Sequence, residues 1–185
     1  MTATGKTGSD ETAPGSGWCS FDTPIGRCRL GWSAKGLTRL CLPEREPHPA
    51  TPLPDDAPDF VREALSRLAR YFAGEREDFA GIPLDLDGVE PARQQLYATL
   101  CRIGWGETET YGSLAAMLGQ PGAARAVGRA MGANPIPVII PCHRILAAGG
   151  RMGGFSAPQG LTTKAELLAL EGVVPEETRQ MGFGF

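Results

Sequence analysis

Apolar and polar residues alternate along the early part of the chain and recur at helical spacing farther on. The alternation predicts an antiparallel meander of short strands separated by turns. The predicted strands are 18–21, 28–32 and 37–42, and the turns are 23–26 and 34–36. The proline-rich and acidic residues 44–58 are expected to form a loop, and residues 79–87 one more extended piece or a loop.

Helical spacing first appears over residues 59–72, with Gly74 as the stop signal. Its predicted buried face carries Phe60, Ala64, Leu65, Leu68 and Phe72. A second helix is expected to start at Pro91 and end before Gly104, because proline at the first helical position sacrifices no hydrogen bond. The apolar residues on its buried face are Leu96, Leu100 and Ile103.

Three further helices are predicted, over residues 111–118, 123–132 and 162–171, the last from a good cap. The first of them should bury Leu114, Met117 and Leu118, and the last should pack Leu167, Leu168 and Leu170. The break at 119–122 makes the first two a helix-turn-helix.

The predicted fold class is therefore α+β, in two parts. A small N-terminal domain, 18–88, holds the antiparallel sheet and one helix, and a mainly helical C-terminal domain, 89–175, holds the helix-turn-helix. The small, polar residues 1–17 and the final residues 176–185 are expected to be tails.

Charge is unevenly distributed although the net charge is −3. No acidic residue lies between Glu109 and Glu166, whereas Arg125, Arg129 and Arg151 do. A segment without acidic residues suits a surface that faces a polyanion. The alternative is that the acidic residues are absent by chance from a stretch rich in glycine and alanine.

The helix at 123–132 is slim, because most of its side chains are alanine or glycine. Arg125 and Arg129 lie four residues apart and share one face. A helix with so few donors for base edges favours close approach to the DNA backbone or minor groove with weak sequence preference. An ordinary helical hairpin is the alternative.

Residues 134–144 have the sequence NPIPVIIPCHR, in which three prolines forbid a helix and favour extended backbone. Four apolar residues, Ile136, Val138, Ile139 and Ile140, predict that this segment is a stiff, buried rod. It would hold Cys142 in one fixed place, as a nucleophile or simply as a small core residue.

The five cysteines show no CxxC spacing and the chain has two histidines, so we expect free thiols and no metal site. No apolar run approaches the ~20 residues that span a membrane, and no signal peptide is recognised.

An ordered series of motifs resembles the O6-alkylguanine-DNA alkyltransferases, also called methylated-DNA–protein-cysteine methyltransferases. The matching motifs are Tyr111 with 113–116, residues 124–128, Asn134-Pro135, the Pro-Cys-His-Arg run at 141–144, and Lys164 with 167–168 and 171–172. The resemblance covers about residues 91–173, and residues 23–26 and 36–37 fit that family's N-terminal domain more loosely.

The resemblance implies DNA repair by direct reversal, in which Cys142 takes the alkyl group from O6-alkylguanine, and O4-methylthymine as well, once and irreversibly. A thiol of pKa ~8.5 needs a base. In the family a water molecule bridges the cysteine and the histidine, here His143, with a glutamate, here Glu171, behind it. Asn134 would hold the turn beside the nucleophile, and Tyr111 would donate a proton to the leaving guanine ring.

The resemblance also implies minor-groove binding and nucleotide flipping, with Arg125 filling the vacated space in the duplex. The implied DNA-binding residues are Thr110, Ser113, Ala124, Arg125, Ala126 and Arg129. The implied substrate-pocket residues are Met131, Val138, Arg144, Gly154, Phe155, Ser156 and Lys164.

Two departures concern the lid of that pocket. Phe155 stands where the family usually has tyrosine, and residues 157–160 are Ala-Pro-Gln-Gly rather than the common glycine pair. The implied partner is double-stranded DNA with alkylated bases, with no cofactor, no metal, no membrane and no obligate protein partner. A monomer is expected, cytoplasmic if bacterial and nuclear if eukaryotic.

Three other functions use the same residues differently. A cysteine hydrolase would need His48 or His143 within direct reach of Cys142. The alkyltransferase-like proteins bind damaged DNA but lack the reactive cysteine, which is present here. A pure helix-turn-helix regulator has no use for the run at 141–144.

Overall fold

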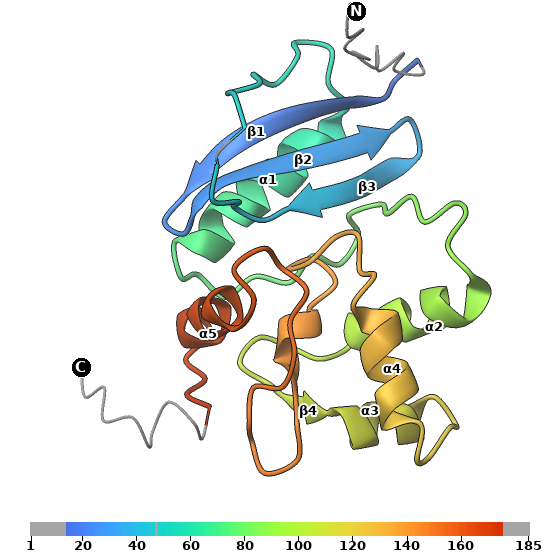
Figure 1. The fold of residues 1–185 in the computed structure, drawn as a ribbon. Helices are drawn as coiled ribbons and strands as arrows, with labels where there is room; N and C mark the ends of the chain where they lie inside the picture. The colour runs from blue at the N-terminus through green and yellow to red at the C-terminus, as the bar shows by residue number, and fades with distance from the viewer. Residues whose placement is uncertain (1–13, 47, 176–185) are drawn as a thin grey trace, which may run out of the picture.

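A computed structural model describes residues 14–46 and 48–175 of the 185-residue chain. Strands β1 (Gly17–Thr23), β2 (Gly26–Ser33) and β3 (Gly36–Cys41) form an antiparallel meander in that order. Helix α1 (Asp59–Phe72) crosses one face of this sheet (Figure 1). The register pairs Cys19 with Leu30 and Leu30 with Leu40, so one row of apolar side chains is buried between sheet and helix.

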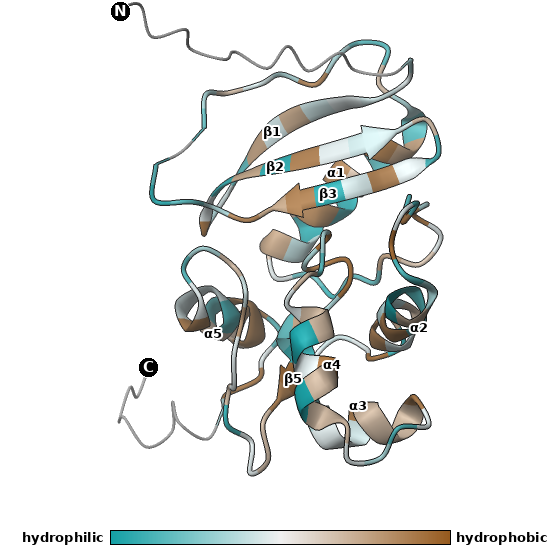
Figure 2. Ribbon diagram, turned by 45° about the vertical axis from the view of Figure 1, so that its right-hand side comes forward, coloured by the Kyte–Doolittle hydropathy of each residue, from teal (hydrophilic) through white to brown (hydrophobic). Residues whose placement is uncertain are grey.

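The rest of the described chain lies beside this layer and is mainly helical (Figure 1). Its elements are α2 (Pro91–Leu100), β4 (Glu109–Thr110), α3 (Tyr111–Met117), α4 (Ala124–Met131), the 3₁₀ turn η1 (Cys142–Arg144), β5 (Ile145–Leu146) and α5 (Leu161–Leu170). Strands β4 and β5 pair in parallel and bring the start of α3 beside η1. Figure 2 shows the hydrophobic bands that alternate with polar ones along β2 and β3.

The predicted α+β class is confirmed, and the helix predicted over 59–72 has the predicted bounds. Hydrogen bonding carries the strands slightly beyond the apolar residues that predicted them, so Gly17 belongs to β1 and not to a tail. The rest of the predicted tails, residues 1–13 and 176–185, lies outside the described residues. No helix within 14–46 and 48–175 is both long and apolar enough to cross a membrane.

Several local predictions were wrong. Helix α2 ends at Leu100, and Ile103 is buried from the turn that follows. Met117 is 53% exposed, because α3 ends there and buries Leu114 and Ala115 instead. Helix α5 begins without a side-chain cap, after Gly160 at φ 56°.

The segment before Cys142 is buried as predicted, but it is a compact turn and not an extended rod. Val138 adopts φ 74°, and Ile140 N donates to Ile136 O at 2.9 Å. Asn134 closes the turn, accepting from Ile136 N at 3.0 Å and donating to Ile140 O at 2.8 Å. The prolines do exclude a helix, but the left-handed residue between them reverses the chain.

Candidate active site

Cys142 is the first residue of η1 and is 4% exposed. Asn134 Nδ2, from the preceding turn, donates a hydrogen bond to its sulfur at 3.0 Å. Burial raises the pKa of the Cys142 thiol, and the Asn134 hydrogen bond and the Lys164 charge oppose that rise without cancelling it. The resting sulfur is therefore a neutral thiol that needs a base to become a nucleophile.

His143 follows within the same 3₁₀ turn and is completely buried. The backbone around it is a 3₁₀ turn, so its side chain and that of Cys142 do not point to opposite faces as neighbours in an extended strand would. Its Nε2 lies 2.7 Å from Glu171 Oε1, and its Nδ1 has no hydrogen-bond partner within the described part of the chain. Burial lowers the pKa of His143, which favours a neutral imidazole that donates from Nε2 and can accept at Nδ1.

Glu171, just after α5, orients that imidazole and is itself strongly held. Arg144 makes a bidentate contact with it, Nε to Oε2 at 2.8 Å and Nη2 to Oε1 at 2.9 Å. Gly106 N donates to Oε2 at 3.2 Å. Burial alone would raise the pKa of Glu171, but the hydrogen bonds and charges of His143 and Arg144 bring it down to about 2. The carboxylate is ionised at any working pH.

Tyr71, from the end of α1, joins this network although sequence reasoning did not assign it a role. Its hydroxyl donates to Glu171 Oε1 at 2.8 Å and lies 3.4 Å from His143 Nε2. Its spacing from Ala64 and Leu68 could have placed it on the buried face of the helix. Its partner is 100 residues away, which no local pattern reveals.

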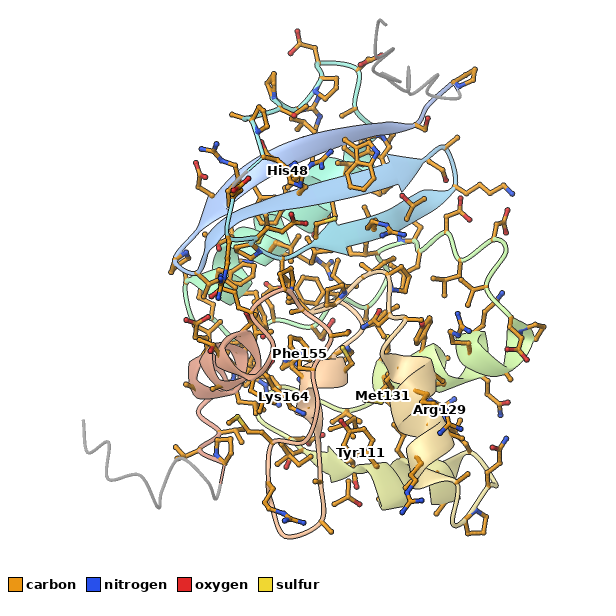
Figure 3. All side chains as sticks on the ribbon, viewed as in Figure 1. His48, Tyr111, Arg129, Met131, Phe155 and Lys164 are labelled. Carbon is orange, nitrogen blue, oxygen red and sulfur yellow. The ribbon has the colours of Figure 1, made fainter. Side chains whose placement is uncertain are left out.

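A cavity of about 850 Å³ opens beside Cys142, and most of its wall is apolar. It is lined by Thr110, Tyr111, Gly112, Ala124, Arg125, Gly128, Arg129, Met131, Gly132, Cys142, Ala147, Ala148, Gly154, Phe155 and Ser156. Figure 3 shows Met131 and Arg129 on α4, Tyr111 at the start of α3, and Phe155 on the loop that faces them. The cavity is large enough for a flat heterocycle and brings it against the sulfur.

Tyr111 stands in the wall of the cavity between two glycines. A β-carbon at Gly153 would come within 3.0 Å of its ring, and one at Gly128 within 3.4 Å. The Tyr111 hydroxyl donates to Gly154 O at 3.2 Å. Burial raises the pKa of Tyr111, so it keeps its proton and can give it to a ligand.

Arg125 and Arg129 are exposed on α4, while Val127 and Met131 bury the opposite side of that helix. Both arginines line the cavity, so the basic face and the cavity adjoin. Thr110 caps α3 by accepting from Ser113 N at 3.0 Å. Ser113 and the exposed Ala126 are outside the cavity lining.

Most predicted pocket residues line this cavity, but three do not. Val138 and Arg144 line a separate, smaller cavity of about 290 Å³ whose lining does not include Cys142. Lys164 is buried and donates to Ile145 O at 2.5 Å and to Met152 O, which ties together the two ends of the loop that carries Gly149 and Arg151. Its Nζ lies 6.0 Å from the centroid of the Tyr111 ring, which is part of the cavity wall.

The lining also contains small residues that the sequence analysis did not assign to the pocket, namely Gly112, Gly128, Gly132, Ala147 and Ala148. These residues contribute by leaving the cavity open, and a search for functional groups in the sequence does not detect that. Within residues 14–46 and 48–175, no group of three or more histidine, cysteine or acidic side chains is placed to hold a metal ion.

Comparison with known proteins matches both halves of the chain. The family model for the 6-O-methylguanine DNA methyltransferase DNA binding domain matches residues 91–173, and that for the ribonuclease-like domain of the same enzymes matches residues 18–86.

A methylated-DNA–protein-cysteine methyltransferase of Mycobacterium leprae is 44% identical over 154 residues, which cover 82% of this chain and 90% of that protein. A DNA base-flipping protein of Thermus thermophilus is 41% identical over 153 residues, 82% of this chain and 97% of its own. The crystal structure of Mycobacterium tuberculosis OGT in complex with DNA superposes with a TM-score of 0.71 at 40% identity, covering 84% of this chain and 92% of that one. The chain therefore belongs to the methylated-DNA–protein-cysteine methyltransferase family.

Proposed function

We propose that this chain repairs DNA by transferring the alkyl group of O6-alkylguanine, and of O4-methylthymine, to the sulfur of Cys142. The observation that carries the proposal is the position of that sulfur. It closes the inner end of a cavity that can hold a purine, and Asn134, His143 and Glu171 stand behind it. Family membership supports the same reaction class, a transferase that repairs DNA by alkyl transfer.

The chemistry is a single displacement at the alkyl carbon. The Cys142 proton passes to His143 Nδ1 through one bridging water, and the imidazolium is stabilised by the ionised Glu171. The sulfur then forms a bond to the alkyl carbon as the bond from that carbon to guanine O6 breaks. Tyr111 donates a proton to the departing ring, so the guanine leaves as a neutral base. The thioether product is stable, which makes each molecule act once.

DNA reaches this site through α4. Its small residues, Ala124, Ala126 and Gly128, let the helix approach a minor groove closely, while Arg125 and Arg129 face the phosphates and the vacated base position. The damaged nucleotide turns out of the duplex at a cost of a few kcal/mol. Thr110 and Ser113, at the start of α3, would bind the DNA backbone beside it.

Met131, Gly154, Phe155 and Ser156 would hold the flipped base, and Lys164 would support Tyr111 and the lid from below. Val138 and Arg144 would act indirectly, Val138 through the Asn134 turn and Arg144 through Glu171. The proposed domains are 18–88, which supports the site, and 89–175, which binds DNA and accepts the alkyl group. We also propose that the protein is a cytoplasmic monomer that uses no cofactor.

The test is intact-protein mass spectrometry after incubation with a duplex that carries O6-methylguanine. We expect a gain of one methyl group per molecule, mapped to Cys142, with the reaction stopping at one equivalent. Cys142→Ala should show no gain while it still binds the methylated duplex. Multiple turnovers of a fluorogenic ester that depend on Cys142, without methylation, would overturn the proposal in favour of a cysteine hydrolase.

A further inference from the structure

The network behind Cys142 receives one side chain from the opposite half of the molecule. Tyr71 belongs to α1, which packs on the sheet, whereas Cys142, His143 and Glu171 all belong to the C-terminal half. Its hydroxyl nevertheless donates to Glu171 Oε1 at 2.8 Å. The carboxylate that orients His143 is therefore held in part by a residue that the DNA-binding half does not contain.

The Tyr71 ring has little freedom to place that hydroxyl elsewhere. The side chain is fully buried, and its ring centroid lies 5.3 Å from Phe72, 5.9 Å from Phe79 and 5.2 Å from Trp105. The edge-on rings of Phe72 and Trp105 and the tilted ring of Phe79 fix the direction of the C–O bond. The position of the hydroxyl is thus set by packing, with Phe72 and Phe79 from the N-terminal half and Trp105 from the C-terminal half, and not by a ligand in the cavity.

Glu171 does not need this hydroxyl to stay ionised, because Arg144 already supplies a bidentate cation. The hydroxyl instead occupies Oε1, the oxygen that also receives the Nε2–H of His143. A donor at that oxygen withdraws negative charge from it and limits how strongly it can hold an imidazolium.

We propose that Tyr71 is a positioning residue for alkyl transfer, through which the N-terminal half fixes Glu171 against His143 and keeps the imidazole neutral, with Nδ1 available for the Cys142 proton. This inference rests on the proposed function. The other charged groups that face His143 are Arg144 and Lys164, which disfavour its protonation, and Glu171, which favours it. Loss of the Tyr71 hydroxyl leaves the effects of Arg144 and Lys164 unchanged and strengthens the effect of Glu171.

The test compares Tyr71→Phe with wild type in single-turnover methyl transfer across pH. Phenylalanine keeps the aromatic packing, so the variant should fold. We expect its rate to match wild type at about pH 8 and to fall progressively below wild type as pH decreases, by up to about tenfold, because the pKa of His143 rises when Glu171 loses the Tyr71 donor. Tyr97→Phe is the matched control, since it removes a buried hydroxyl that has no partner among the described residues.

A second readout does not depend on the reaction. The chain has two histidines, and ¹⁵N NMR can follow the buried His143 ring separately from that of His48, whose side chain is 44% exposed. Wild-type His143 should be the neutral Nε2–H tautomer at neutral pH, and Tyr71→Phe should raise its pKa. If the variant does not fold, the tautomer of His143 in the wild-type protein tests the proposal instead. An Nδ1–H tautomer would contradict it, because Tyr71 would then donate to His143 Nε2 and not to Glu171.

An unchanged pH profile, or an equal loss of rate at every pH, would overturn the role of Tyr71 while leaving the reaction at Cys142 intact. If wild type transfers no methyl group at all, the proposed function fails instead, and the titration still reports whether Tyr71 controls His143.

Discussion

Asn134 donates its side-chain amide to the sulfur of Cys142 at 3.0 Å, and the same amide group bonds to Ile140 O. One residue thus closes the turn that carries the nucleophile and contacts the nucleophile itself. Because its Oδ1 also accepts from Ile136 N, the amide holds a loop in which Val138 is in a left-handed conformation.

Asn134→Ala should therefore lower both stability and reactivity. Loss of these partly buried hydrogen bonds should reduce the free energy of unfolding by about 2 kcal/mol, as measured by urea denaturation. Methyl transfer should also slow at neutral pH, because the pKa of the Cys142 thiol rises further without its donor. Gln94→Ala, which removes hydrogen bonds to Leu86 O and Val89 O away from the site, is the control. A wild-type transfer rate in Asn134→Ala would contradict this account.

Tyr111→Phe should slow methyl transfer by about 10²-fold while leaving binding of the methylated duplex nearly unchanged. The ring still fills the space between Gly128 and Gly153, so the variant loses the proton donor but not the wall of the cavity. Single-turnover kinetics and a fluorescence binding assay separate the two effects. Weakened binding with an unchanged chemical step would mean that Tyr111 shapes the pocket and donates no proton.

Arg125→Ala should reduce repair of a methylated duplex far more than reaction with free O6-methylguanine base. The free base needs no flipping, so the difference between the two losses of rate reports the cost of turning the nucleotide out of the base stack. Arg102→Ala removes an exposed arginine outside the Cys142 cavity and should affect neither substrate. Equal losses on both substrates would exclude Arg125 from flipping.

Acid should destabilise the fold through Glu171 and His143. The pKa of Glu171 is about 2 in the folded chain, below its ordinary value of 4.5, so its stabilising contribution is complete above 4.5 and is lost as pH falls toward 2. The pKa of His143 is lowered from 6.5, so the unfolded chain binds that proton more readily once pH falls below 6.5. Thermal unfolding midpoints should therefore decline steadily from about pH 6.5 downward. A flat profile from pH 6.5 to about 4.5 would count against the His143 assignment, and a flat profile from 4.5 toward 2 would count against the Glu171 assignment.

The sequence predicted most of the scaffold because its signals are local. The spacing of Leu68 and Phe72 defined α1, and the Pro-Cys-His-Arg run located the nucleophile. It could not predict that Val138 turns the chain back, since a positive φ at a β-branched residue runs against local preference and is imposed by Asn134 and the packing around it.

The sequence predicted the candidate site best where the residues are close together in the chain, and least well where residues far apart in the chain come into contact. Arg144 was expected in the pocket wall, yet its guanidinium turns away to Glu171 and Ile103 O. Tyr71 was missed because its role depends on how α1 packs against Trp105 and the end of α5. Tertiary contacts of that kind have no signature in the spacing of residues along one segment.

The 4% exposure of Cys142 has a consequence for how the protein is used up in a cell. A molecule that reacts once is wasted if a passing oxidant or a small electrophile captures its thiol first. Because the sulfur is neutral, buried and hydrogen-bonded to Asn134, such reagents react with it slowly. Burial thereby helps to keep unreacted molecules available for lesions.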